Sequence, residues 1–217
     1  EPIKVETSKT EPAKVTTSKT EPLKVETSKE DTAYDALYEK RLKHYYNDLK
    51  WLYCELYQDN PYVTMHLNDL LKVLKKFYDM RGNALKESVL KREKDPTWYK
   101  RNDLTGMMMY VNAFAGTLSN LESKLDYIQE CNVNYLHLMP LLDSPRGRSD
   151  GGYAVADFRK VQEELGTMDD FAALTAACHN RGINVCLDFV MNHTSEDHEW
   201  AKRARAGEKE YQDRYFF

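Results

Sequence analysis

Two short polar segments carry the residues whose types and spacing could do chemistry. They are Ser149-Asp-Gly-Gly-Tyr153 and Asp188-Phe-Val-Met-Asn-His193. Asp150 precedes two glycines, where a carboxylate on a permissive backbone can accept hydrogen bonds from two adjacent hydroxyl groups. Tyr153 can lay its ring against an apolar C–H face, and His193 can hydrogen-bond through both ring nitrogens. Such groups would bind and orient a polyhydroxylated ligand.

Each of these residues also has a structural explanation. Asp150 could bond its own loop backbone in a turn, Tyr153 could be a buried packing residue, and His193 could be structural. Asp188 and Asn192 are interpreted mainly as structural residues of the second segment. Residue types alone leave these alternatives open.

The elements that must position these residues alternate between strands and helices. Periodicity and capping patterns predict strands at 107–114, 133–141 and 183–191, and helices at 119–131, 167–180 and 196–206. The β-α-β-α-β order implies parallel strands with right-handed crossovers. The strand at 183–191 is expected to be buried on both faces, so that Asn192 and His193 follow at its carboxyl end, where α/β folds build sites. The long polar insertion at 143–166 is expected to be functional.

A different pattern precedes these elements. Residues 1–30 are three copies of a decapeptide, Glu-Pro-x-Lys-Val-x-Thr-Ser-Lys plus Thr or Glu. One valine and one variable residue per repeat bury too little apolar area to offset the conformational entropy lost when the chain is ordered, which predicts a disordered linker. A low-affinity interaction tract is the alternative. Residues 31–104 predict a helical domain, with a helix start capped at Thr32 and leucine and tyrosine stripes that form its core. The α/β part then occupies residues 105–217.

Composition limits the partners. The 217 residues are 41% hydrophobic, which is sufficient for a core, and the net charge is -4. Because the chain has no excess of positive charge, it is not expected to bind nucleic acid. No apolar run approaches the ~20 residues needed for membrane insertion. The four cysteines are widely spaced and are expected to be buried free thiols. Unpaired cysteines slightly favour a cytoplasmic location over a secreted or surface one, which the linker-like repeats would fit.

Three stretches together resemble the α-amylase superfamily of glycoside hydrolases and transglucosylases, and within it the amylosucrases. They are Tyr135-Leu-His-Leu-Met-Pro-Leu141, Ser149-Asp-Gly-Gly-Tyr-Ala-Val155, and Asp188-Phe-Val-Met-Asn-His-Thr-Ser195 followed by His198 and Trp200. The third stretch is also similar to oligo-1,6-glucosidases and trehalose synthases. The Asp-Gly-Gly-Tyr loop, the Leu-Met-Pro strand end and the helical prefix favour amylosucrase. The resemblance covers residues 32–217.

The resemblance implies a (β/α)8 TIM barrel that cleaves sucrose with retention and passes glucose to an α-1,4-glucan. It makes Asp150 part of the bottom of a glucosyl pocket, Tyr153 the stacking platform, and His193 a hydrogen-bonding partner of the glucosyl hydroxyls. The family's catalytic carboxylates follow the fourth, fifth and seventh strands, whereas three strands are predicted here. We therefore assign no catalytic residue, and we expect an incomplete barrel, preceded by the helical domain and the disordered repeat linker, that is inactive by itself.

No metal or other cofactor is predicted. In α-amylases the asparagine that matches Asn192 can ligate calcium, but the further oxygen ligands of such a site are not found here. A zinc cluster of His193, Asp197, His198 and Glu199 is not expected either, because the spacing does not match two histidines on one helix face.

Two other functions stay open. The first is a hydrolase of α-glucosides or malto-oligosaccharides on the same barrel. The second is a noncatalytic sugar-binding or interaction protein, consistent with the missing carboxylates. Both enzyme hypotheses imply a small-molecule sugar substrate such as sucrose or an α-glucan, and the third implies a sugar ligand or a protein partner. None of the three implies nucleic acid.

Overall fold

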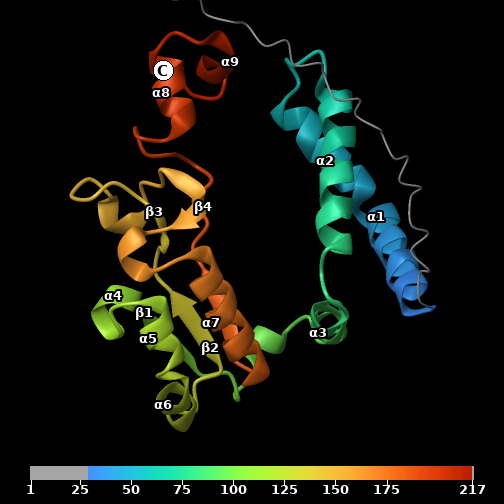
Figure 1. Ribbon diagram of the computed structural model, residues 1–217. Helices are drawn as coiled ribbons and strands as arrows, with labels where there is room; N and C mark the ends of the chain where they lie inside the picture. Colours follow the sequence, from blue (N-terminus) through green and yellow to red (C-terminus); the bar gives the residue numbers. More distant parts are fainter. Residues whose placement is uncertain (1–28, 217) are drawn as a thin grey trace, which may run out of the picture. The chain divides into compact units, whose positions relative to one another are not determined.

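The computed structural model describes residues 29–216 (Figure 1). The chain divides into two compact units, Glu1–Glu93 and Lys94–Phe217. The predicted repeat linker lies outside the described residues except for its last two positions, which belong to the first helix. The predicted domain boundary at residue 104 stays a prediction.

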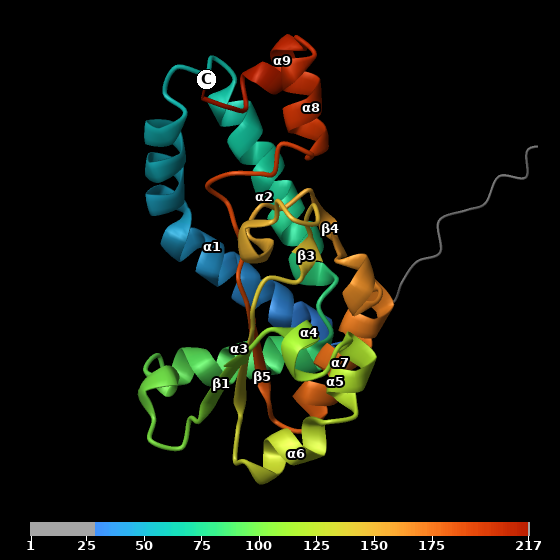
Figure 2. The same cartoon turned by 90° about the vertical axis from the view of Figure 1, so that its left-hand side faces the viewer.

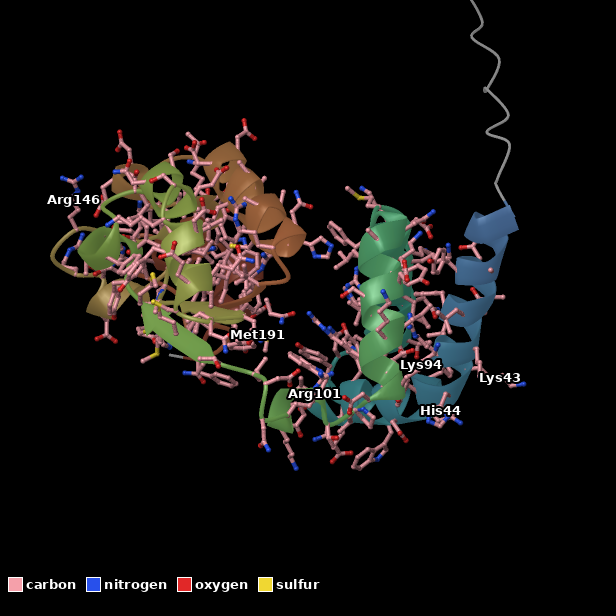
Figure 3. The ribbon with its side chains drawn as sticks, turned by 90° about the horizontal axis from the view of Figure 1, so that it is seen from below. Lys43, His44, Lys94, Arg101, Arg146 and Met191 are labelled. Atoms are coloured by element: carbon pink, nitrogen blue, oxygen red, sulfur yellow. The ribbon has the colours of Figure 1, made fainter. Side chains whose placement is uncertain are left out.

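Three helices make up the described part of the first unit. They are α1 (Lys29–Leu56), α2 (Val63–Asp79) and α3 (Asn83–Lys94). The predicted helix start at Thr32 is wrong, because α1 already begins at Lys29. Figure 3, seen from below, shows α3 lying lengthwise beside α1. Arg41 on α1 forms an ion pair of 2.6 Å with Glu93 on α3, in agreement with this placement.

Residues near the start of α1 contact α2. The Tyr78 hydroxyl donates to the Tyr34 carbonyl at 2.9 Å, and Lys75 lies 3.1 Å from Asp35. The prediction that the apolar stripes form a core is only partly correct, since Leu67 is buried but several stripe residues are exposed. The exposed ones are Tyr45, Leu52, Leu56, Leu74 and Phe77. The helices therefore bury these stripes over only part of their length, and α1, with 28 residues, is longer than α2, with 17.

The second unit is organised around a parallel three-stranded sheet. Its strands are β1 (Gly106–Met109), β2 (Tyr135–Leu138) and β5 (Asn184–Leu187), in the order β1-β2-β5. Met108 pairs with His137, which pairs with Cys186. The predicted parallel order of the three strands is therefore observed, although each strand is shorter than the apolar run that predicted it.

Helices cover one side of this sheet. They are α4 (Val111–Phe114), α5 (Leu118–Glu122), α6 (Leu125–Glu130) and α7 (Met168–Asn180). Figure 2 shows α5 and α7 on the same side of the strands. The shared core is built from buried apolar side chains of the strands and helices. It includes Met109, Val111, Leu118, Leu121, Leu125, Ile128, Leu136, Leu138, Leu174 and Cys178.

Two of the predicted elements are divided. The predicted strand 107–114 ends at Met109, because backbone bonds from Phe114 to Tyr110 and from Ala115 to Val111 close helical turns. The predicted helix 119–131 is two helices, since the Lys124 backbone (φ -98°, ψ 4°) leaves the helical region. Its start is capped by Thr117, two residues before the predicted Ser119.

The polar insertion after β2 forms a small second sheet. Its antiparallel strands are β3 (Leu142–Asp143) and β4 (Asp157–Val161). Short 3-10 turns lie at η1 (Trp98–Lys100), η2 (Asp150–Gly152) and η3 (Glu163–Leu165). The chain then continues through β5 into a pair of helices, α8 (Glu199–Arg205) and α9 (Lys209–Gln212), which pack against each other (Figure 1). The helix predicted at 196–206 begins three residues later than expected, at Glu199, because His198 is its N-cap.

The expectation that β5 is buried on both faces is wrong for the described residues. Leu187 is 38% exposed and Phe189 is 66% exposed, and Met191, labelled in Figure 3, is 84% exposed. The strand ends at Leu187, so Phe189 and Met191 lie in the loop that follows it. β5 also pairs only with β2, so its other edge is open within residues 29–216.

The cysteines are free, but only Cys178 is buried, and Cys131 is exposed. Burial raises the pKa of the Cys178 thiol to about 11. Among the described helices, none combines the length and apolar character needed to cross a bilayer.

The α7 capping box provides a test of the fold. Thr167 and Asp170 bond each other's backbone N–H. The Thr167 hydroxyl also donates to Asp170 Oδ2 at 2.7 Å, and this bond, together with those from the Thr167 N–H and the Ser119 hydroxyl, holds the pKa of Asp170 below its usual value. Such a group stabilises the fold above its unfolded pKa of about 3.9, and the stabilisation is lost as pH falls through the lower folded pKa. We expect Asp170→Asn to lower the melting temperature at pH 7, with a smaller difference below about pH 4.

The matched control is Asp169→Asn, because Asp169 is the other acidic residue in the first turn of α7. A melting temperature that falls equally in both variants, or a difference that does not change with pH, would contradict the capping role.

The open side of β5 generates a second prediction. The unpaired edge of β5 runs into an exposed apolar segment, with Leu187 at the end of the strand and Phe189 and Met191 in the loop that follows it, and this surface is expected to associate with another copy. In sedimentation velocity the chain should sediment faster than a 25.4 kDa monomer. The double substitution Phe189→Glu with Met191→Glu should shift it towards monomer. The control pair Tyr127→Glu with Met168→Glu adds the same charge at exposed helix positions and should not change the sedimentation. An equal shift in both double variants would show that association does not occur through this surface.

Candidate functional site

Strand alternation separates a core face of the sheet from a polar face. Leu136 and Leu138 point towards the helices and are buried. His137 between them therefore points to the opposite face, in a row with Met108 and Cys186.

Asp188 follows β5 at the position that continues this alternation, two residues after Cys186. The polar face thus presents a histidine from β2 and a carboxylate from the end of β5.

The Asp-Gly-Gly-Tyr loop has an unusual backbone. Asp150, Gly151 and Gly152 have φ of 48°, 68° and 96°, so three consecutive residues are left-handed. Glycine adopts this conformation readily, and aspartate is among the side chains that tolerate it. At Gly152 a Cβ would also lie 2.8 Å from the Pro140 Cβ, so any side chain would collide with the end of the preceding segment. The two glycines are therefore required to turn the chain sharply before Tyr153.

The turn places Tyr153 against Asp188. The Tyr153 hydroxyl donates to Asp188 Oδ2 at 3.0 Å, and this bond is the leading cause of a raised Tyr153 pKa. His137 Nε2 lies 3.2 Å from Asp188 Oδ1. The side chains of His137 and Asp188 are each 27% exposed. Asp188 therefore joins the two predicted polar segments, which are 35 residues apart at these positions.

His137 was not predicted as a site residue. Its sequence signals are a single polar residue within the apolar strand Tyr135-Leu-His-Leu138 and its place in a stretch that resembles the α-amylase superfamily. The pairing with Asp188 depends on strand register, which the sequence alone does not provide.

The remaining predicted residues occupy different surroundings. Asp150 is exposed next to Tyr153. Asn192 and His193 are also exposed, and Asn192 Nδ2 lies 3.4 Å from His193 Nδ1.

His193 lines a cavity of about 790 Å³ with Phe158, Phe189 and Trp200. The described lining of this cavity does not include Tyr153 or Asp188. The structure therefore joins Tyr153 with Asp188 and places His193 on an adjoining loop. The roles assigned to Asp150, Tyr153 and His193 stay predictions.

The loop that carries Asp150 is fastened to the loop that carries His193. Ser195 N–H donates to the Val155 carbonyl at 2.8 Å, and Arg148 Nη2 lies 2.8 Å from Asp197 Oδ2. Arg148 also forms an ion pair with Glu196. These contacts hold the two predicted polar segments next to each other. Arg146, by contrast, projects outward from the same loop (Figure 3).

His198 has a capping role. Its Nδ1 accepts a hydrogen bond from Trp200 N–H at 3.1 Å at the start of α8, and burial lowers its pKa. Within residues 29–216, no three His, Cys, Asp or Glu side chains gather as a metal site would require.

Comparison with known proteins defines the class of this chain. The family model described as "Alpha amylase, catalytic domain" matches residues 74–217. The chain therefore belongs to the α-amylase family, and its three parallel strands are part of an α-amylase-type (β/α)8 barrel, which confirms the predicted fold class.

Its relatives include enzymes with several activities. Trehalose synthase/amylase of Mycobacterium tuberculosis is 44% identical over 118 residues, which cover 51% of this chain and 19% of that enzyme. Oligo-1,6-glucosidase of Saccharomyces cerevisiae is 35% identical over 130 residues, 57% of this chain and 22% of the enzyme. A MutB mutant solved in complex with glucose has a TM-score of 0.50 and 34% identity over 55% of this chain and 22% of MutB. The chain thus spans about a fifth of the length of these proteins.

The bond between Tyr153 and Asp188 gives a prediction that needs no substrate. Because the Asp188 carboxylate raises the Tyr153 pKa, the substitution Asp188→Asn removes the charge and should lower that pKa towards its ordinary value. The measurement is a pH titration followed by NMR of tyrosine labelled with carbon-13 at Cζ. Tyr127, whose raised pKa is caused mainly by Cys131, is the internal control and should not move. An unchanged Tyr153 titration would show that the bond is not formed in solution.

Proposed function

We propose that the complete protein is a retaining transglucosylase of the amylosucrase type, which cleaves sucrose and transfers the glucosyl unit to an α-1,4-glucan. Asp150 and His193 would hydrogen-bond the glucosyl hydroxyls, and Tyr153 would stack on the sugar ring. No nucleophile or general acid is assigned within residues 1–217. The two carboxyl groups that a retaining glycosidase needs would come from other parts of the protein.

The observation that carries the proposal is the left-handed turn from Asp150 to Gly152. It exposes the Asp150 carboxylate beside Tyr153, while the tyrosine hydroxyl is bonded to Asp188. An anchored hydroxyl leaves the ring face available, and an exposed carboxylate next to it can bond sugar hydroxyls. This is the arrangement of an aromatic platform with a polar rim.

The relatives support a sugar substrate in general terms. Their names refer to trehalose and to oligo-1,6-glucosides, and a MutB mutant was solved with glucose. The same names favour the second candidate, a hydrolase of α-glucosides or malto-oligosaccharides. What favours sucrose as the donor is the resemblance of the Asp150–Tyr153 loop to amylosucrases.

The test is fructose release from sucrose by the complete protein, compared with its Asp150→Ala variant. We expect fructose from the parent and at least a ~100-fold loss of kcat/KM in the variant, since the charged hydrogen bonds to two hydroxyls are removed together. Asp169→Ala, at an exposed position of α7, is the control and should retain activity.

Two outcomes would change the conclusion. Glucose or maltose released from oligosaccharides, with no fructose from sucrose, would support the hydrolase. Full activity in Asp150→Ala would remove this residue from the proposed pocket whichever substrate is used.

A further inference from the structure

We propose that His137 is a positioning residue of the glucosyl site, which fixes the Asp188 carboxylate and through it the ring of Tyr153. This inference rests on the proposed function, because it concerns the same sugar platform. It assigns a role to a residue in the middle of a strand, outside both polar segments.

The first step is the geometry of Asp188. One carboxylate oxygen lies 3.2 Å from His137 Nε2, and the other accepts from the Tyr153 hydroxyl at 3.0 Å. Rotation of an aspartate about its Cβ–Cγ bond is broad when nothing holds it. One donor would fix a single oxygen and leave the other free to turn. Two donors on two oxygens fix the carboxylate plane.

The second step is the environment of His137. The strand buries Leu136 and Leu138 on the core face, and His137 between them lies on the other face, outside that core. Across the polar face the strand neighbours of His137 are Met108 and Cys186, which offer no charged partner. Asp188 is therefore the charged group towards which the His137 ring is directed. A packing role alone would be met by an aliphatic residue.

The third step connects Asp188 to the sugar platform. Tyr153 is only half-buried and follows a loop with three left-handed residues, so packing on its ring is incomplete. The bond from its hydroxyl to Asp188 fixes the far end of the ring. If His137 does not hold Asp188, the ring loses the anchor that sets its orientation towards a sugar. Stacking needs that orientation before the substrate arrives.

The experiment uses the complete protein with His137→Leu and His137→Gln. Glutamine keeps an N–H donor at nearly the reach of Nε2, whereas leucine removes it. We expect kcat/KM for sucrose to fall about tenfold in His137→Leu and to be largely retained in His137→Gln. His179→Leu, at an exposed histidine near the end of α7, is the control and should change kcat/KM less than about twofold.

A double-mutant cycle separates positioning from general stability. If His137 acts through Asp188 on the Tyr153 hydroxyl, His137→Leu should have little further effect in a Tyr153→Phe protein, because the anchored hydroxyl is already absent. An equal loss in the Tyr153 and Phe backgrounds would overturn the proposal, as would equal losses in His137→Leu and His137→Gln.

A second measurement does not depend on the substrate. In the carbon-13 NMR spectrum, the Tyr153 Cζ resonance should shift in His137→Leu but remain in place in His137→Gln and His179→Leu. An unchanged resonance in His137→Leu would overturn the positioning role. If the parent protein releases no fructose while the resonance shifts as expected, the sucrose proposal fails and the positioning role stands.

Discussion

Burial of Leu136 and Leu138 against the helices is the interaction on which the rest of the site depends. Each buried leucine contributes about 2 kcal/mol of apolar transfer free energy. Because side chains alternate along a strand, this burial forces His137 to the other face of the sheet. A shift of one residue would bury the histidine and expose both leucines, so the register is strongly determined. The position of His137 relative to Asp188 follows from that register.

The second constraint is the turn that delivers Tyr153. Its three left-handed residues store backbone strain at Asp150, which the surrounding contacts must offset. One such contact is from the Tyr110 hydroxyl, which lies 3.4 Å from the Gly151 carbonyl. Another is the close packing of Gly152 on Pro140, where a side chain has no room. The loop is therefore held from both sides, and the strained residue is the one whose carboxylate is exposed.

Contacts between loops hold the two polar segments next to each other. The Ser195 to Val155 backbone bond and the ion pairs of Arg148 join the insertion after β2 to the loop after β5. Exposed ion pairs contribute little individually, and the backbone bond provides the directional part of this connection. Asp188 adds a partly buried connection between the same two segments. A sugar held by residues from both loops would depend on all of these contacts.

Local patterns determined much of this protein in advance. The capping box at Thr167 and Asp170, the parallel strand order and the two polar segments are readable from the sequence, because caps, apolar runs and glycine pairs are local signals. The α-amylase family could likewise be predicted from three short motifs. Only the tertiary structure decided where the strand 107–114 ends, that β5 has an open side, and that His137 meets Asp188. These outcomes depend on strand register and on which faces find a partner, and both are set by contacts between residues far apart in the chain.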